Sequence, residues 1–466
     1  MLKIFSKCLL FILMFVVLLG CSNAKSEPTT PATVVTFSGY CLGTKEDNNL
    51  YRRLIKRFND EQNEIEIKII EFNDYSSSAP DVFVENIVSD DVFNQRIANI
   101  TEFVKDDEDW KKINPVIRES VTFADNVFVI PMNLYFEGYY ANYKLINQFL
   151  SNEKAEEKFV AGNYDVEEFF EIIKDMYALK TNDSRVGIST TGGMMNWLPA
   201  ALDETDSLEY FVWNDNAKNL DFKNESAINA FKIIPEIYKY SFENVVTNKS
   251  ESYFTNDNDE VAFLDGRIGF HQSHSFWNCQ DNDKLDVNFV AYPNQKVIAN
   301  FDCLCISPEA NNKAAAYEVA KYLSFGSEGI KTAISIVEAN PNSNISLPGL
   351  PLIEDSDIYE AWFKHIGVDG VYEVYKEVAK GNIEIIVNET KLILGYSEAY
   401  YTKETNISYP EIRDGLKLSV GEYFWFLGNG SIPFENYLND FDDELMTSIN
   451  ELIKPKYEYL EVLLGN

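Results

Sequence analysis

Apolar and polar residues follow two different periods along the chain, and together they predict an α/β fold. Residues 51–58 carry apolar side chains at the spacing of one helix face, whereas 33–37 and 65–71 alternate with the period of a strand. The segment 80–84 is a further predicted strand. This β-α-β-β order predicts an open sheet with right-handed crossover connections.

The same patterns predict the later elements. Asn163 or Asp165 is a suitable N-cap for a helix expected at 163–180, and Pro235 is expected to kink a helix at 225–240. Helices are expected at 90–97, 163–180, 225–240 and 312–325, with a mostly helical C-terminal third. Strands are expected at 186–189, between a turn at 265–266 and Phe276, at 287–292 and at 299–307.

The stretch 126–143, NVFVIPMNLYFEGYYANY, combines six aromatic residues with Asn133, Glu137 and Asn142. Its apolar run 127–130 stops at Pro131, which predicts a strand leaving a core, a short exposed passage and a second strand. Two interpretations remain open for this stretch. It is either a pair of core strands or a crossing between two lobes that places polar and aromatic side chains in a cleft.

The ends of the predicted strands give candidate ligand contacts. In open α/β sheets, ligands bind beyond the carboxyl ends of the strands. That rule points to Tyr40 after the first strand and to Glu85 and Asn86 after the strand at 80–84.

Length and charge limit the possible function classes. A chain of 466 residues suggests two domains, and 45% hydrophobic content with 14% aromatic residues is typical of a folded protein. The formal net charge of −34 argues against nucleic acid as a partner and against electrostatic docking on an anionic membrane.

The N-terminus has the features of an export signal. Lys3 and Lys7 precede the apolar run 8–19, which at roughly a dozen residues is short for a membrane span. The following LLGC at 18–21 resembles the bacterial lipobox, which implies a signal peptide at 1–20, lipid on Cys21 and a tether at 21–32. We therefore expect an extracytoplasmic protein held to the membrane by lipid only; an ordinary secretion signal is the alternative.

The remaining cysteines and the histidines give no clear site. Disulfides among Cys41, Cys279, Cys303 and Cys305 are possible in an exported chain, but two pairs do not make a framework. His271, His274 and the cysteines match no zinc spacing, so we expect no metal. The HExxH, GxSxG and GxxxxGK[ST] motifs are absent from the sequence, and we expect neither a cofactor nor catalytic residues.

Several segments resemble, in one shared order, the solute-binding proteins of sugar-type ABC importers, the maltose-binding-protein-like class. No single segment is specific, but their order is. Besides the lipobox they are FNDEQNEIEIKI (58–69), PDVFVEN (80–86), VFVIPMNLYFEGYYAN (127–142), YDVEEF (164–169), AFLDGRIGF (262–270) with its trailing SFW, and ISPEANNKAAAYEVAKYL (306–323).

This resemblance implies a two-lobe α/β fold of the periplasmic-binding-protein type II, with a ligand cleft and three hinge crossings. The first two crossings would be 131–135 and 299–303, and the third would follow the helix that ends near Phe325. The implied function is capture of a solute, most simply a sugar, and its delivery to ABC permease subunits by a monomer. The lobes would comprise 33–132 with 303–335, and 133–302 with 336–466.

The resemblance also implies a set of ligand contacts that suits a sugar, since aromatic rings stack on its C–H face and carboxylates or amides bind its hydroxyls. For Trp197, Phe276 and Tyr135, packing in the core is the alternative role. The expected contacts are Tyr40, Glu85, Asn86, Asn133, Tyr135, Met194, Trp197, Phe276, Trp277, Asn300, Asp302, Tyr396 and Glu398.

Two other functions remain as alternatives. An exported carbohydrate-active hydrolase would need two carboxylates at a defined separation, and no stretch isolates such a pair. A surface lipoprotein without a transport role would be expected to show internal repeats, which the sequence lacks.

Overall fold

The computed structural model describes most of the chain between residues 31 and 386 and a few later positions. No helix within the described residues is long and apolar enough to cross a membrane. The described residues are 31–45, 48–71, 79–85, 91–92, 94–123, 125–150, 154–159, 162–177, 185–202, 213–214, 219–220, 225–247, 258–277, 283–343, 345–366, 370–386, 427, 432–436, 447, 451, 454 and 458.

The first lobe is built on three parallel strands. β1 (Thr33–Ser38) lies between β2 (Ile65–Ile69) and β3 (Val82–Glu85) and runs parallel to both. α2 (Leu50–Glu61) connects β1 to β2, and Asn49 caps it by accepting a hydrogen bond from the Arg52 backbone. The β-α-β-β order that the sequence predicts is confirmed.

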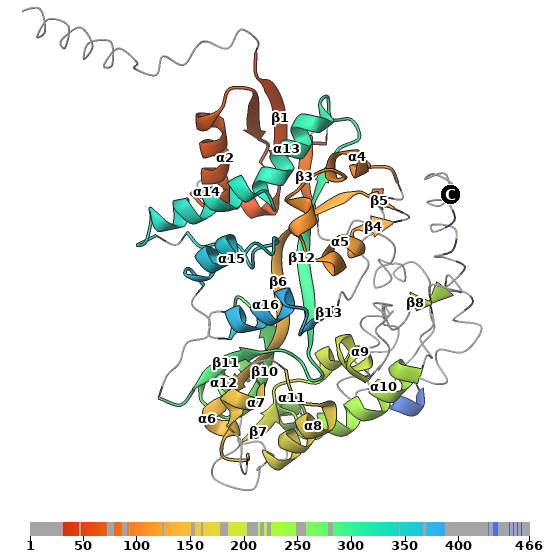
Figure 1. The fold of residues 1–466 in the computed structure, drawn as a ribbon. Coiled ribbons are helices and arrows are strands. Elements are labelled where there is room, and N and C mark those ends of the chain that lie inside the picture. The colour runs from red at the N-terminus through yellow and green to blue at the C-terminus, as the bar shows by residue number, and fades with distance from the viewer. Residues whose placement is uncertain are drawn as a thin grey trace, which may run out of the picture.

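Two helices from much later in the chain complete this lobe. α13 (Lys313–Leu323) and α14 (Ser327–Glu338) contact α2, and α13 also packs against β1 and β3 (Figure 1). The chain therefore leaves the first lobe and returns to it, as a two-lobe fold requires.

Two long strands run between the lobes (Figure 1). β6 (Val129–Asn142) and β12 (Lys296–Ile306) are antiparallel and pair with each other from 129 to 136 of β6. The C-terminal half of β12 pairs with β3, whereas the C-terminal half of β6 pairs with β10 (Ile268–His274) and β11 (Val287–Val290). Nine of the described strands thus form one sheet that continues through both lobes.

The second lobe packs helices around the far end of this sheet. β7 (Val186–Ile188) adds to β10 in parallel, giving the path β2-β1-β3-β12-β6-β10-β7. α8 (Val166–Asp175) contacts β7, and α10 (Glu225–Tyr238) contacts α8. Asp165 is the N-cap of α8 and forms a capping box with Glu168, and Pro235 lies inside α10.

The stretch that begins at Asn126 differs from its prediction. The hydrophobic pattern predicts two strands with an exposed passage between them, whereas β6 is one continuous strand of 14 residues. Its pairing partners change along its length, from β12 to β10 and β11, so no stretch of its backbone lacks a neighbouring strand. A strand can continue without interruption where its pairing partners change, because its backbone N–H and C=O groups still find hydrogen-bond partners.

A second difference concerns the helix expected at 90–97. Asp91 and Val92 are helical, but residues 94–97 form a turn in which Gln95 has a φ of 57°. This left-handed backbone cannot continue a right-handed helix, and the apolar spacing gives no sign of it.

The third passage between the lobes is the segment between α14 and α16 (Val371–Ala379), which includes Leu350 and α15 (Ser356–Phe363). α15 contacts α14 in the first lobe, α16 contacts β11 in the second, and β13 (Glu384–Ile386) pairs with β12. The expected lobe boundary at residue 335 lies inside α14, which packs against α2 of the first lobe.

The remaining elements are short. Four of them form two separate two-stranded sheets: β4 pairs with β5, and β8 pairs with β9. They are η1 (Tyr40–Leu42), α4 (Thr101–Val104), η3 (Trp110–Lys112), α5 (Pro115–Ser120), β4 (Thr122–Phe123), β5 (Asn126–Val127), α6 (Tyr143–Ile146), α7 (Ala155–Phe159), η4 (Gly192–Asn196), α9 (Leu198–Leu202), β8 (Trp213–Asn214), β9 (Asn219–Leu220), α11 (Phe242–Thr247) and α12 (Asp259–Leu264).

Candidate functional site

A row of half-buried side chains follows the two crossing strands. On β6, buried residues alternate with half-buried Asn133, Tyr135 and Glu137, and on β12 with half-buried Asn300 and Asp302. Successive residues of a strand point to opposite faces, so this alternation puts one polar and aromatic row on one side of the sheet. We call these five residues the crossing face.

The end of the crossing face toward the first lobe is a chain of hydrogen bonds. Asn133 Nδ2 donates to Asp302 Oδ2 over 2.7 Å, and the Tyr51 hydroxyl of α2 donates to Asn133 Oδ1. The Tyr40 hydroxyl donates to Asp302 as well. Asp302 is therefore held from two sides, by a hydroxyl of the first lobe and by an amide of the other crossing strand.

This polar chain lies in a weakly solvated environment. Burial is the largest cause that raises the pKa of Tyr40 and of Tyr51, and the charge of Asp302 adds to it, so both hydroxyls stay protonated and act as donors. Burial also raises the pKa of the neighbouring Cys41 thiol to about 12, which keeps it neutral. Neutral donors around one carboxylate suit the recognition of hydroxyl groups.

The end toward the second lobe is aromatic. The Tyr135 ring meets that of Phe276 edge to face at 5.1 Å, and Phe276 stacks at a tilt on His274 at 4.0 Å. Phe276 is 48% exposed, which is unusual for so large an apolar side chain. Beside these rings, Asn300 Nδ2 donates to Glu137 Oε1 over 2.5 Å.

The backbone fixes the position of Phe276. Buried Ser275 exchanges two hydrogen bonds with Phe136 of β6, from its backbone N–H at 2.7 Å and to its hydroxyl at 3.1 Å. This clamp holds the turn after β10 against the crossing strand. His274 lies directly opposite Glu137 in the β10–β6 pair, so its ring joins the same side of the sheet.

The two crossing strands are out of register beside this site. Asn300 pairs with Tyr135 and Asp302 with Met132, so Asn133 and Leu134 together face Phe301 in a β-bulge. Asn133 has a φ of 53°, a left-handed conformation in which asparagine is enriched. The third passage joins here, because the Leu350 N–H donates to the Leu134 carbonyl over 2.6 Å.

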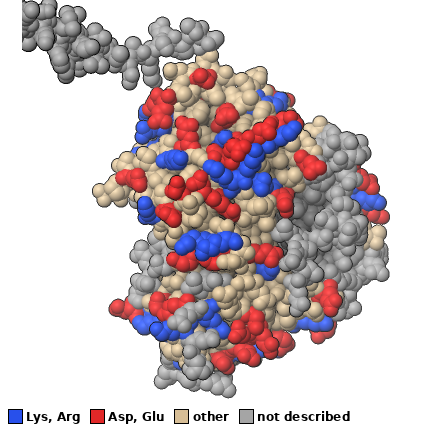
Figure 2. Space-filling view, in the orientation of Figure 1, with Lys and Arg blue, Asp and Glu red and all other residues tan. Residues whose placement is uncertain are grey.

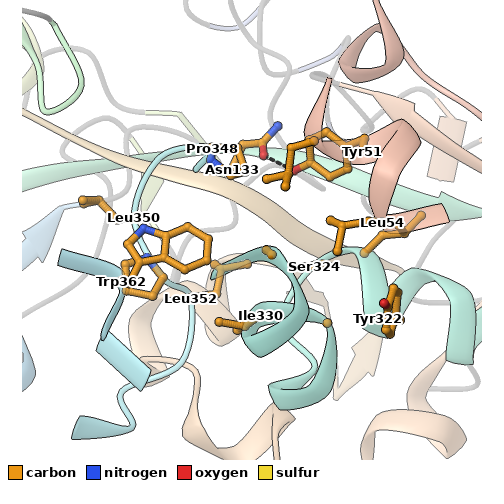
Figure 3. Close-up of a pocket in the computed structure, with 15 residues that line it drawn as sticks. Tyr51, Leu54, Asn133, Tyr322, Ser324, Ile330, Pro348, Leu350, Leu352 and Trp362 are labelled. Atoms are coloured by element: carbon orange, nitrogen blue, oxygen red, sulfur yellow. Dashed lines mark hydrogen bonds between the residues drawn. The ribbon is translucent and has the colours of Figure 1, made fainter. Parts of the chain in front are cut away.

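A small cavity of about 30 Å³ lies beside this bulge on the first-lobe side (Figure 3). Polar residues that line it include Tyr51, Asn133, Tyr322 and Ser324, and Leu350 and Trp362 are among its apolar walls. Its volume suits a single water molecule rather than a sugar, so we do not place the ligand in it.

Most of the expected contacts that the structure describes converge on the crossing face. Tyr40, Asn133, Tyr135, Asn300, Asp302 and Phe276 lie at or beside it. Glu85 ends β3 opposite Cys303 of β12, is half-buried, and has a pKa raised by burial and by Asp91. Asn86, Tyr396, Glu398 and Cys21 lie outside the described residues.

Three expected contacts lie elsewhere. Met194 and Trp197 have no exposed surface, and the Trp197 ring stacks on Tyr292 at 5.0 Å. The Trp277 ring packs on Tyr140 at 4.9 Å, and its indole N–H donates to Glu260 over 3.3 Å. Core packing accounts for all three, the alternative that the sequence leaves open for Trp197, and we leave them out of the candidate site.

Three residues join the site that the sequence does not assign to it. Glu137 is undecided at the sequence level, although its period of two with Asn133 and Tyr135 gives the signal. His274 precedes Phe276 by two residues and could be found in the same way. Tyr51 could not, because its helical spacing marks it only as core.

The described cysteines form no disulfide. Cys41, Cys303 and Cys305 are free thiols, and Cys279 lies outside the described residues. Within the part of the chain that the structure describes, no cluster of His, Cys, Asp and Glu could hold a metal ion. Figure 2 shows acidic and basic side chains interspersed on the face in view, without one broad basic patch.

Residues 53–344 match the family model of bacterial extracellular solute-binding protein. No curated protein matches the chain.

Three solved structures resemble the fold across nearly the whole chain. The sugar-binding protein MalE of Xanthomonas citri has a TM-score of 0.63 at 11% identity, covering 92% of this chain and 99% of its own. A Rhizobium etli sugar transporter in an open conformation has a TM-score of 0.60 at 14% identity, covering 91% of this chain and 99% of its own. A Listeria monocytogenes ABC substrate-binding protein in complex with cycloalternan has a TM-score of 0.51 at 14% identity, covering 93% of this chain and 99% of its own.

Proposed function

The chain belongs to the bacterial extracellular solute-binding protein family, and from this premise we propose that it captures a sugar or oligosaccharide between its two lobes. Members of this family bind solutes rather than transform them, and the family indicates an extracytoplasmic location. The three similar structures are named as sugar or substrate-binding proteins of transport systems, which supports a carbohydrate ligand for this chain as well.

The crossing face is the observation that carries the proposal. It combines half-buried Tyr135 with two carboxylate–amide pairs, Glu137 with Asn300 and Asp302 with Asn133, and exposed Phe276 lies beside it. A pyranose ring offers an apolar C–H face for the rings and directed hydroxyls for the paired acids and amides. We assign the ligand to Tyr40, Asn133, Tyr135, Glu137, His274, Phe276, Asn300 and Asp302, with Glu85 at the margin.

Capture would work by closure of the lobes around the ligand. The crossing face lies on the strands that connect the lobes, with Tyr40 contributed from the first lobe and Phe276 from the second. A ligand that contacts both lobes in the closed form and one in the open form shifts the population toward closure. ABC permease subunits would then recognise the closed form and receive the solute.

Membrane attachment is the part of the proposal that rests on the sequence alone. The LLGC at 18–21 favours lipid on Cys21, and 22–32 provides a polar, proline-containing tether. A membrane-bound protein that becomes soluble after Cys21→Ser would support the anchor, whereas unchanged membrane association would contradict it.

A thermal-shift panel tests the ligand class. Purified protein is heated with neutral mono- and oligosaccharides, sugar phosphates, peptides and polyols, and each incubation is analysed for products. A ligand that binds only the native state stabilises it, by about 2.7 kcal/mol when its concentration is a hundredfold above Kd, and therefore raises the thermal midpoint. We expect neutral sugars to raise it without turnover.

Two outcomes would change the conclusion. Hydrolysis products from a stabilising sugar would favour the carbohydrate-active hydrolase. A panel in which no solute shifts the midpoint would favour a surface lipoprotein without a transport role.

A further inference from the structure

All three passages between the lobes are joined at the β-bulge of β6. Asn133 contacts Asp302 of β12 through its side chain, and Leu134 accepts a hydrogen bond from Leu350 of the third passage. Close to this second contact, Gly349 has a φ of 65°, and a Cβ there would lie 2.2 Å from the Leu134 carbonyl oxygen. The three passages therefore meet within two consecutive residues of β6.

Asn133 meets two demands that few residues can meet together. Its φ of 53° is adopted at little cost only by Gly, Asn and Asp. Its amide also has to accept from the Tyr51 hydroxyl with one atom and donate to Asp302 with the other. Glycine would supply the backbone without the ties, and aspartate would supply only the acceptor.

The tie through Asp302 connects the bulge to the proposed ligand. Asp302 accepts from both Asn133 and Tyr40, and Tyr40 is 41% exposed at the crossing face. A solute hydroxyl that binds Asp302 or Tyr40 must adjust to the orientation that Asn133 sets. A rotation at the bulge that keeps the hydrogen bond from Asn133 would likewise move the Asp302 carboxylate.

The small cavity described above lies where the bulge, α2 and the third passage meet. Its walls come from α2, from the turn at Ser324, and from the third passage at Leu350 (Figure 3). Movement of the third passage against α2 would therefore change the shape of this cavity, whose volume of about 30 Å³ suits one water molecule.

We propose that Asn133 is a positioning residue that couples solute contact at Asp302 to rotation of the lobes at the bulge. This inference rests on the proposed function, because it names how the same site reports a bound solute to the hinge. In this role Asn133 acts through its ties to Asp302 and Tyr51.

The sharpest test exchanges the two partners. Asn133→Asp keeps the left-handed preference and the acceptor for Tyr51, but it sets a second carboxylate against Asp302. The double variant N133D/D302N restores one donor and one acceptor in reversed order, and the new amide at position 302 can still accept from Tyr40. Asn133→Gly keeps the backbone and removes both ties without adding charge. Asn163→Asp, at an exposed position before α8, is the matched control.

Two measurements on the purified proteins separate positioning from simple stability. Small-angle X-ray scattering of the ligand-free forms reports lobe orientation, and calorimetry reports affinity for maltotriose. We expect N133D to change the ligand-free scattering and to weaken maltotriose binding by about 5–150-fold, the usual range for coupled sites. N133G should show a smaller effect of the same kind. The double variant should return the ligand-free scattering toward wild type.

Unchanged scattering and affinity in N133D and N133G, with only a lower melting temperature, would overturn the inference. The inference would also be overturned if the ligand-free scattering of the double variant were no closer to wild type than that of N133D. If wild-type protein does not bind maltotriose, the sugar assignment is in question, while the ligand-free scattering of the four variants still decides the role of Asn133.

Discussion

At the scale of single residues, the candidate site depends on pairs rather than on isolated groups. Each carboxylate of the crossing face is held by an amide, Glu137 by Asn300 and Asp302 by Asn133. A paired carboxylate keeps lone pairs for a solute while its orientation is fixed, which reduces the entropy lost on binding. At the aromatic end, exposed Phe276 is the residue whose surface a ligand would cover.

Phe276→Ala should weaken sugar binding by about 1–3 kcal/mol, because the stacking surface and its edge-to-face contact with Tyr135 are lost. Calorimetric titration with the sugar that most raises the thermal midpoint measures the change. Val261→Ala, which shortens another exposed apolar side chain on α12, should leave the affinity unchanged. Equal affinity of Phe276→Ala and wild type would remove Phe276 from the site.

His271 gives a prediction about pH. Burial against Phe263 and Trp277 lowers its pKa from the ordinary 6.5, although Asp259 and Glu260 act in the opposite direction. The unfolded chain then binds a proton near pH 6.5 that the folded protein resists, so this residue's contribution to stability is lost as the pH falls below 6.5.

The measurement is the unfolding free energy of wild type minus that of His271→Asn, obtained from urea denaturation at about pH 8 and about pH 5, on either side of the ordinary histidine pKa. Asparagine does not titrate, so this difference should be larger at the higher pH than at the lower. A difference that is constant, or that grows at the lower pH, would contradict the assignment of a lowered pKa.

At the scale of elements, the lobes depend on a few close approaches of backbone to backbone. The clearest lies between the third passage and β6, where the Cβ position of Gly349 is 2.2 Å from the Leu134 carbonyl oxygen. Gly381 has a similar backbone, with a φ of 76°, but no atom lies within 4 Å of its Cβ position. The two glycines therefore separate backbone conformation from close approach.

Gly381→Ala should lower the unfolding free energy by about 1–2 kcal/mol, the usual cost of a left-handed alanine. Gly349→Ala should lower it by at least about 2 kcal/mol more, because its methyl group also displaces the third passage from β6. Urea denaturation of both variants checks the order. Equal losses in the two would mean that the third passage is not held tightly against Leu134.

The elements themselves are largely predictable from the sequence, and their exceptions have physical causes. Helix α13 and strands β1, β2 and β3 follow from apolar spacing, which reports burial directly. Spacing does not report a strand that changes partners, so it predicts β6 in two pieces. Nor does it report a left-handed residue, so it predicts a helix at the turn of Gln95 and gives no signal for the conformation of Asn133.

The candidate site is predictable in part for the same reason. Tyr135, Asn300 and Asp302 come from the family resemblance, and the structure puts them on one face. Met194 and Trp197 come from the same source, but both are buried. Their burial could not be predicted, because a Gly-rich turn in the sequence does not reveal which side its side chains face. Tyr51 needs the tertiary contact with Asn133 to be seen at all.

At the scale of the whole molecule, two features determine how the protein would work. One sheet extends through both lobes, so the crossing strands transmit movement between them. The net charge of −34 makes a polyanionic partner unfavourable and disfavours anionic solutes in general. Together they favour a neutral solute that closes two lobes around strands already in place.

The most direct test of this account is calorimetric titration of the best sugar from the panel into wild type and Tyr135→Ala. Tyr135 lies at the centre of the crossing face and contacts the rings of Phe276 and His274. We predict one sugar per wild-type chain, and at least about tenfold weaker binding to the variant through lost stacking. Equal affinity in both proteins would contradict the account, because the sugar would then bind away from the crossing strands.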